Sequence, residues 1–175
     1  YIAVERVDRN GQTPSKTPWM FKDNISSWTW TGYEGTSASV DVYSDAEEVE
    51  LFLNDESLGR KKAGKENQYM AEFTVPYQAG TLMAIDYVNG MERGRYSLET
   101  AKKSTTLDVK MDKKVLTANG QDLCYLNITL CDESGKTNQQ EIKQITVSVD
   151  GAGKLQGLGS SNPSNEEDYF DRCCN

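Results

Sequence analysis

Short segments in which apolar and polar residues alternate recur along most of the chain, with turn-forming residues between them. In residues 69–75, for example, Tyr69, Ala71, Phe73 and Val75 fall on one face of an extended strand. Asn89-Gly90 is a strong two-residue hairpin signal. No segment has a convincing helical period, so the pattern predicts an all-β protein. The expected strands are residues 2–7, 39–43, 49–53, 57–60, 69–75, 81–87, 91–98, 106–111, 123–131 and 144–149.

The spacing of these strands predicts two tandem immunoglobulin-like β-sandwich domains in the 175 residues. A polar break at residues 99–104 interrupts the alternation, which then restarts. We therefore expect an extended connector over residues 1–26, a first sandwich over 27–101 and a second over 102–175. The second sandwich is expected to be truncated at its C-terminus, because the tail offers no plausible final strand.

Strand alternation also predicts which side chains form the two cores. A one-residue error in register would turn all of them outward, so their burial is a strict test of the pattern. The expected core of the first domain is Val40, Val42, Val49, Leu51, Leu53, Phe73, Val75, Leu82 and Ala84, and that of the second is Leu107, Val109, Leu126, Ile128, Leu130, Val147 and Val149.

Charge and composition exclude several classes of function. The formal net charge is −8, which disfavours nucleic acid and anionic membranes as partners. No apolar run approaches the roughly 20 residues of a membrane-spanning helix. The chain contains no His, so it cannot form Ser-His, Cys-His or His-metal centres by itself. We expect no cofactor and no catalytic residue here.

Acidic groups are the remaining candidates for chemistry. Glu47-Glu48, Asp132-Glu133 and residues 166–168 could in principle supply paired carboxylates for glycoside hydrolysis. Neighbouring carboxylates in turns are far more often solvated surface charges, and that is the interpretation we favour. Residues 165–171 are rich in oxygen ligands but lack the spacing of a calcium-binding loop, so no metal site is predicted.

Four aromatic residues, Trp19, Trp28, Trp30 and Tyr33, are close together in the sequence. Exposed indole rings can stack on sugars, whereas buried ones anchor a connector against a domain. Structural or interdomain packing is the favoured interpretation, with sugar contact as the alternative.

The four cysteines, Cys124, Cys131, Cys173 and Cys174, lack zinc-site spacing. Ordinary thiols are favoured and a disulfide is the alternative, so the sequence leaves the compartment open.

Several motifs, in order along the chain, carry a family resemblance. They are SWTWTGYEG at residues 27–35, VYSDAEEVELFLN at 42–54, SLG at 57–59, FTVPY at 73–77, LTANGQDLCY at 116–125 and VDGAGKLQGLGSSNP at 149–163. This string resembles the C-terminal sandwich modules of bacterial family 2 glycoside hydrolases of the β-galactosidase type. The departure is Asp55, where the family usually has Gly after the turn Asn.

The resemblance implies a structural, non-catalytic role beside the catalytic barrel of the same parent chain. In such enzymes, which retain anomeric configuration, the nucleophile and the acid/base lie in that upstream barrel, so no catalytic residue is carried over to this chain. The chain begins at Tyr1 and is expected to be excised from a longer bacterial protein. Two alternatives stay open: a stand-alone carbohydrate-binding pair, and an adhesin or spacer of immunoglobulin-like modules.

Overall fold

The structure, a computed structural model, describes residues 1–9, 22–161, 168–170 and 173–174. The chain divides into two compact units, residues 1–140 and residues 141–175. Apart from one turn of 3-10 helix, η1 (Lys65–Asn67), the regular elements in the described residues are all strands. The all-β prediction is confirmed.

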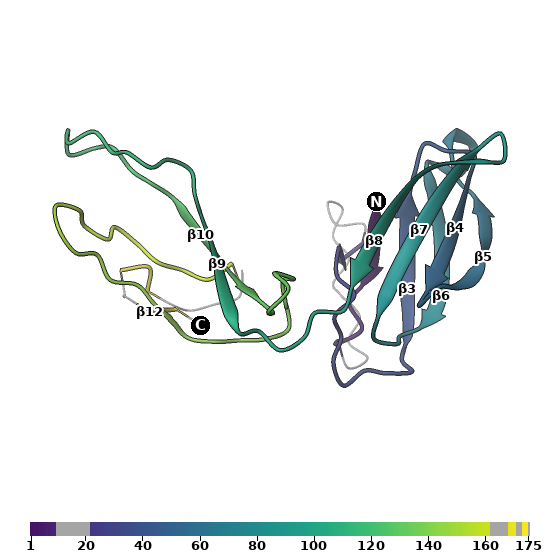
Figure 1. Cartoon of the computed structure of the whole chain (residues 1–175), viewed down its shortest axis with the longest axis horizontal. Helices are drawn as coiled ribbons and strands as arrows, with labels where there is room; N and C mark the ends of the chain where they lie inside the picture. Colours follow the sequence, from purple (N-terminus) through teal and green to yellow (C-terminus); the bar gives the residue numbers. More distant parts are fainter. Residues whose placement is uncertain (10–21, 162–167, 171–172, 175) are drawn as a thin grey trace. The chain divides into compact units, whose positions relative to one another are not determined.

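Two four-stranded antiparallel sheets form a sandwich in the first part of the larger unit (Figure 1). One sheet, here the first sheet, has the order β2-β1-β3-β6, and the other, the second sheet, has the order β5-β4-β7-β8. The strands are β1 (Ile2–Glu5), β2 (Asn24–Ile25), β3 (Ser37–Tyr43), β4 (Glu48–Leu53), β5 (Glu56–Lys62), β6 (Met70–Pro76), β7 (Thr81–Val88) and β8 (Met91–Glu99). Strand β1 pairs with both β2 and β3, so residues 2–5 are part of the first sheet.

The core of this sandwich follows from the alternation of apolar and polar residues along its strands. In β4, Val49, Leu51 and Leu53 are buried, and the residues between them are half-buried on the other face. All nine side chains that the sequence predicts for the first core are buried. Asn89 and Gly90 both have positive φ, as the predicted hairpin turn between β7 and β8 requires.

A two-stranded antiparallel ribbon, β9 (Thr106–Met111) paired with β10 (Leu126–Cys131), follows the sandwich within the same unit. Its pairing places six apolar side chains on one face: Leu107, Val109, Met111, Leu126, Ile128 and Leu130. That face is largely uncovered within the unit, since Leu107 is 50% and Leu126 51% exposed. The predicted burial of Leu107, Val109 and Leu126 is therefore wrong in this structure, although the predicted alternation is present.

The smaller unit contains one short antiparallel pair, β11 (Ile145–Thr146) with β12 (Cys173–Cys174). Val147 is half-buried and Val149 is exposed, so Val149 also departs from the predicted core. No disulfide joins Cys124, Cys131, Cys173 or Cys174 in the described part of the chain. Among the described residues, no helix is long and apolar enough to cross a membrane.

Candidate functional site: a joint at the end of the sandwich

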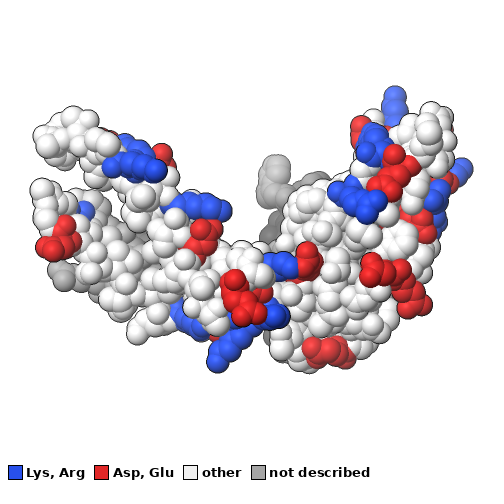
Figure 2. All heavy atoms as spheres, viewed as in Figure 1, with Lys and Arg blue, Asp and Glu red and all other residues white. Residues whose placement is uncertain are grey.

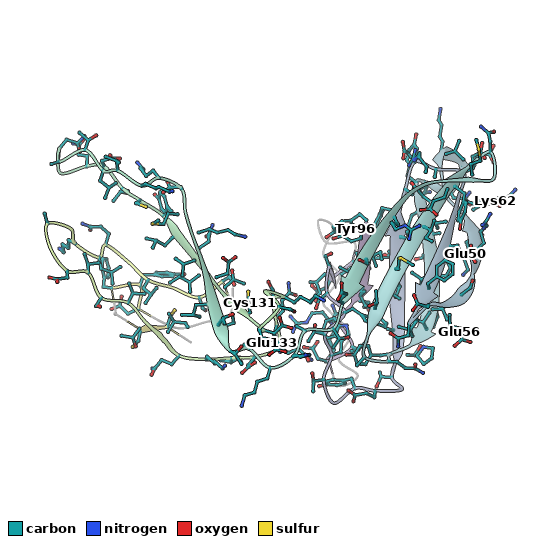
Figure 3. All side chains as sticks on the ribbon, viewed as in Figure 1. Glu50, Glu56, Lys62, Tyr96, Cys131 and Glu133 are labelled. Atoms are coloured by element: carbon teal, nitrogen blue, oxygen red, sulfur yellow. The ribbon has the colours of Figure 1, made fainter. Side chains whose placement is uncertain are left out.

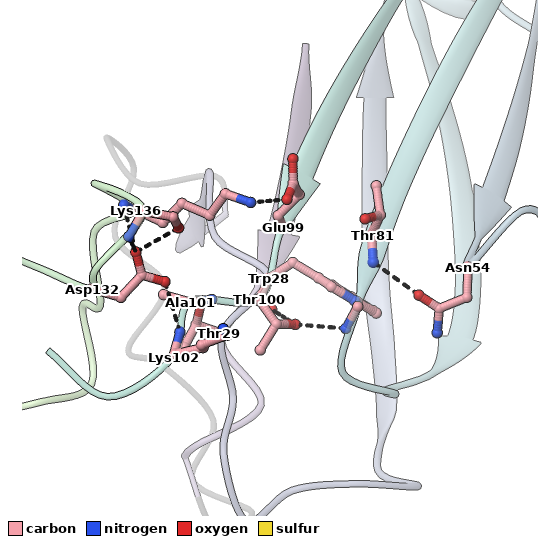
Figure 4. A network of polar contacts seen from close by, with 12 residues as sticks. Trp28, Thr29, Asn54, Thr81, Glu99, Thr100, Ala101, Lys102, Asp132 and Lys136 are labelled. Carbon is pink, nitrogen blue, oxygen red and sulfur yellow. Dashed lines mark hydrogen bonds and ion pairs between the residues drawn. The ribbon is translucent and has the colours of Figure 1, made fainter.

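The end of β8 leads directly into a segment that is held from two sides. We call this segment, residues 99–104, together with residues 28–31 and 131–140, the joint. All of these residues lie in the larger compact unit. Figure 4 shows the hydrogen bonds that hold the joint together.

On the sandwich side, the joint is held by the residues around the two tryptophans. Thr100 donates from its Oγ1 to the Trp28 carbonyl at 2.6 Å, and it accepts from the Gly80 N–H at 3.0 Å. The next residue, Ala101, donates its backbone N–H to Thr29 Oγ1 at 2.9 Å. Ala101 and Thr29 are both buried, so this bond satisfies a donor that water cannot reach.

On the other side, the Asp132 carboxylate accepts hydrogen bonds from residues 100–102, which we call the linker, and from its own turn. Its Oδ2 accepts the backbone N–H of Lys102 at 3.0 Å. Its Oδ1 accepts from the Ser134 N–H, the Ser134 hydroxyl and the Lys136 N–H at 2.8, 2.7 and 3.0 Å. The carboxylate thus joins the linker to the turn that follows β10.

These hydrogen bonds explain the ionisation of Asp132. The Ser134 hydroxyl and the backbone N–H groups of Lys102 and Lys136 stabilise the carboxylate, and they hold the pKa of Asp132 well below its usual range. The residue is only 2% exposed. The prediction that Asp132 is a solvated surface charge is therefore wrong, because a turn carboxylate surrounded by N–H donors is stable when buried.

Outer contacts reinforce the joint. The Lys136 ammonium pairs with Glu99 at the end of β8, and the Lys102 ammonium pairs with Glu133 at 2.8 Å. Gln140 Oε1 accepts the Thr31 N–H at 2.7 Å, and Asn138 Nδ2 donates to the Lys102 carbonyl at 3.2 Å. In the view of Figure 2, acidic and basic side chains lie next to one another over the surface. Such exposed ion pairs contribute little to stability individually, so the buried and part-buried hydrogen bonds hold the joint.

The aromatic residues that the sequence singles out lie beside this joint or outside the described residues. Trp28 and Trp30 are buried in the sandwich core. The Trp28 indole N–H donates to the Gln78 carbonyl at 2.9 Å, and its ring meets Tyr77 edge-on at 5.0 Å. Tyr33 is half-buried against the same core, and Trp19 lies outside the described residues. Neither buried indole offers a face to a sugar ring.

The other candidate carboxylates have structural partners or lie outside the described residues. Glu47 accepts the Asn89 N–H at 2.8 Å, and Glu48 lies 3.6 Å from the Arg60 guanidinium. Both line an open hollow of about 540 Å³ between residues 45–48 and 62–67. Within the described part of the chain, no group of three or more His, Cys, Asp or Glu side chains could hold a metal ion. Glu166 and Glu167 lie outside the described residues, and Asp168 is exposed.

Sequence reasoning misses most of the joint. Thr29, Thr100 and Lys136 are ordinary surface residue types. Nothing in their spacing indicates that each contacts a residue distant in the sequence, as Thr29 does with Ala101, 72 residues away. The one available signal is residues 132–135, Asp-Glu-Ser-Gly, where an Asp before a Ser and a Gly favours a side-chain-capped turn.

The chain is similar in sequence and structure to parts of several larger proteins. Residues 107–173 match the family described as glycoside hydrolase family 2 C-terminal domain 5, and residues 35–94 match a domain family of unknown function, DUF4982. The β-galactosidase BoGH2A of Bacteroides ovatus is 30% identical over 147 residues, which are 82% of this chain and 17% of that protein.

Solved structures agree with these sequence matches. A family 2 glycosyl hydrolase from Bacteroides cellulosilyticus superimposes with a TM-score of 0.89 at 33% identity, over 99% of this chain and 23% of that one. A β-glycosidase from Bacteroides vulgatus gives 0.71 at 25% identity, over 85% of this chain and 19% of that one. The chain thus spans about a fifth of the length of these relatives. Fold, ordered motifs and matches together identify the chain as a C-terminal accessory region of the family 2 glycoside hydrolases.

Proposed function

We propose that this chain is a non-catalytic structural region of a bacterial β-galactosidase-type glycosidase, and that its partner is the catalytic barrel of the same parent protein. The observation that carries the structural role is the joint. It uses one buried and two part-buried hydrogen bonds, on both sides of the linker at residues 100–102, to fix the ribbon to the sandwich. Such an arrangement suits a module that holds position and does not turn over substrate.

The chemistry of the described residues supports the non-catalytic part of this proposal. The carboxylates that could form a catalytic pair are engaged in hydrogen bonds or ion pairs: this holds for Glu47, Glu48, Asp132 and Glu133. Asp132 in particular accepts the backbone N–H groups of Lys102, Ser134 and Lys136. The parent would hydrolyse O-glycosidic bonds with a carboxylate pair on its barrel.

We also propose that residues 102–175 form one second domain. The match to a single family domain over residues 107–173 supports this division, because it runs without interruption from the ribbon into the following unit. The carbohydrate-binding alternative is weaker, because Trp28 and Trp30 are buried. The adhesin alternative is weaker because the relatives described above are glycosidases.

The test is hydrolysis of a nitrophenyl β-galactoside by this chain and by the full-length parent at equal molar concentration. We expect turnover by the parent alone. Turnover by the repurified chain would contradict the non-catalytic role. A parent gene that encodes no glycosidase barrel would contradict the assignment of the partner.

A further inference from the structure

The outer face of the second sheet carries a row of apolar side chains on its two central strands. Leu51 of β4 and Ala84 of β7 form a buried pair that points into the core. The neighbouring pair, Phe52 and Met83, therefore points outward, and both side chains are half-buried. Ile85, which is 7% exposed, and the half-buried Tyr87 continue this row along β7 on the same face.

One end of the row is ordered by an Arg-Tyr-Glu cluster. The Arg60 guanidinium lies 3.6 Å from the centroid of the Tyr87 ring. Glu50 accepts from the Tyr87 hydroxyl at 3.2 Å and from Arg60 at 3.1 Å. Figure 3 labels Glu50 on this face. Tyr and Arg are enriched in protein interfaces, and side chains already held in one arrangement lose little freedom when a partner binds.

The chain itself covers part of the opposite outer face, that of the first sheet, around Asp41. Asp41 of β3 points outward there, yet it is 0% exposed. The Lys22 ammonium donates to its two carboxylate oxygens at 2.9 and 2.8 Å, and Asn24 Nδ2 donates at 2.7 Å. The segment around residues 22–24 thus covers Asp41 with satisfied polar groups, whereas Tyr43 and Thr74 stay exposed on the same face. On the outer face of the second sheet, Phe52, Met83 and Tyr87 instead form an apolar row that is half-buried.

We propose that the row Phe52, Met83, Ile85 and Tyr87, with Arg60 and Glu50 at its end, is the surface on which the catalytic part of the parent chain docks. This inference rests on the proposed function. Most of each relative's length lies outside the matched region, so the occupant is covalently tethered to this chain. Tethering gives a high effective concentration, and a narrow apolar row flanked by ion-paired residues is then enough for stable contact.

The first experiment uses the two methionines as reporters of solvent access. Met83 lies in the row, and Met91, at the tip of the β7–β8 hairpin, is 71% exposed. Hydroxyl-radical oxidation of both is measured in the full-length parent and in this chain, and each rate is normalised to that of the urea-unfolded protein. We expect Met83 to be oxidised at least about fivefold more slowly in the parent, with the Met91 rate changed by less than twofold.

Equal Met83 rates in the two proteins would overturn the proposal. Slow oxidation of Met83 in this chain alone, relieved by dilution, would also overturn it and would identify a second copy as the occupant. Neither result bears on galactoside hydrolysis by the parent, so failure of the docking surface is separable from failure of the proposed function.

A matched pair of variants tests the same surface. Phe52→Arg places a guanidinium in the row, and Thr74→Arg places one on the outer face of the first sheet, where Thr74 of β6 is exposed. In the parent, we expect Phe52→Arg to restore fast oxidation of Met83 and Thr74→Arg to leave it slow. The fluorescence of the buried Trp28 and Trp30 confirms that each variant is folded. Protection of Met83 that survives Phe52→Arg in a folded parent would refute the docking surface.

Discussion

Asp55 occupies the second position of the turn between β4 and β5, where both central residues have left-handed backbone dihedrals. Asn54 has φ 50° and Asp55 has φ 67°, the arrangement of a type I′ hairpin turn. Gly adopts this region without cost, and Asn and Asp tolerate it better than other residues, but their Cβ makes it less favourable than it is for Gly. The family's usual Gly is replaced here, so the turn keeps its shape with a residue that is less favourable there than Gly.

Replacing that residue should stabilise the protein. We expect Asp55→Gly to raise the free energy of unfolding by about 0.5–1 kcal/mol, because relief of the positive φ outweighs the added freedom of the unfolded chain. Urea denaturation monitored by tryptophan fluorescence measures the change. As a control, Glu56→Gly in the first position of β5 should lower stability by a similar amount. A loss of stability in Asp55→Gly would show that the Asp side chain supports the turn.

Glycine is required at position 80 for a different reason. Its φ is 137°, and a Cβ placed on it would lie 1.8 Å from Asn54 Oδ1. That Asn54 side chain is itself fixed, because Oδ1 accepts the Thr81 N–H at 2.9 Å and Nδ2 donates to the Ala79 carbonyl at 3.1 Å. The conformation and the close approach both require glycine at this position.

Gly80→Ala should therefore lower the free energy of unfolding by roughly 2 kcal/mol or more, since the strained backbone and the displaced Asn54 amide both contribute. Thermal denaturation monitored by circular dichroism measures the change. The effect of Gly80→Ala in an Asn54→Gly background separates the two contributions, because both proteins of that comparison lack the Asn54 hydrogen bonds and the clash, and only the strain differs between them. Full stability of Gly80→Ala alone would mean that Asn54 can move away at little cost.

Among the elements, the first sandwich could be predicted from the sequence because its strands are covered on one side only. Under that condition, alternation identifies the buried face, and residues such as Leu51 and Phe73 are buried as expected. The same rule places Leu107 and Leu126 on one face of the ribbon, but it does not say whether anything covers that face within the unit. The alternation of apolar and polar residues shows which face of a strand is apolar, but it does not show which element covers that face.

The joint could not be predicted because its bonds join side chains to backbone groups that are distant in the sequence. Thr29 and Ala101, for example, are separated by 72 residues. Hydroxyl side chains have no characteristic spacing when they cap a remote N–H group, so their role becomes visible only when the strands around them are placed.

Thr29 gives the joint a direct test. We expect Thr29→Val to lower the free energy of unfolding by about 1–3 kcal/mol, because Val keeps the shape but leaves the buried Ala101 N–H without its acceptor. Thr31→Val, at an exposed position of the same segment, should change stability by less than about 0.5 kcal/mol. Hydrogen exchange of the Ala101 amide should accelerate in Thr29→Val only. Unchanged exchange there would show that this bond does not hold the joint.

At the scale of the whole molecule, the ionisable side chains predict a simple dependence of the free energy of unfolding on pH. The chain has no His, so no side chain with an ordinary pKa near 6.5 titrates between pH 5 and 8. The pKa of Asp132 is lower in the folded protein than its ordinary value of 3.8. Its carboxylate therefore stabilises the fold above about pH 4, and this contribution is lost as the pH falls below that value.

We expect the free energy of unfolding to be nearly constant from pH 5 to 8 and to fall in more acidic solution. Asp132→Asn should be less stable than the wild type at pH 6, and the difference should shrink as the pH falls below about 4. Urea titrations of both proteins from pH 2.5 to 8 measure this convergence. Parallel curves through the acid range would show that Asp132 is not ionised in the way that its hydrogen bonds require.

The backbone hydrogen bonds of the joint limit how this protein can diverge. Ala101 and Lys102 give their N–H groups to Thr29 and Asp132, so the linker is recognised through atoms that almost every amino acid possesses. Most substitutions at these two positions keep the backbone N–H groups, but proline does not, because it lacks this group. Over evolutionary time, the identities that selection must preserve are those of the acceptors, Thr29 and Asp132. In distant relatives, we expect the linker sequence to vary more than these two positions.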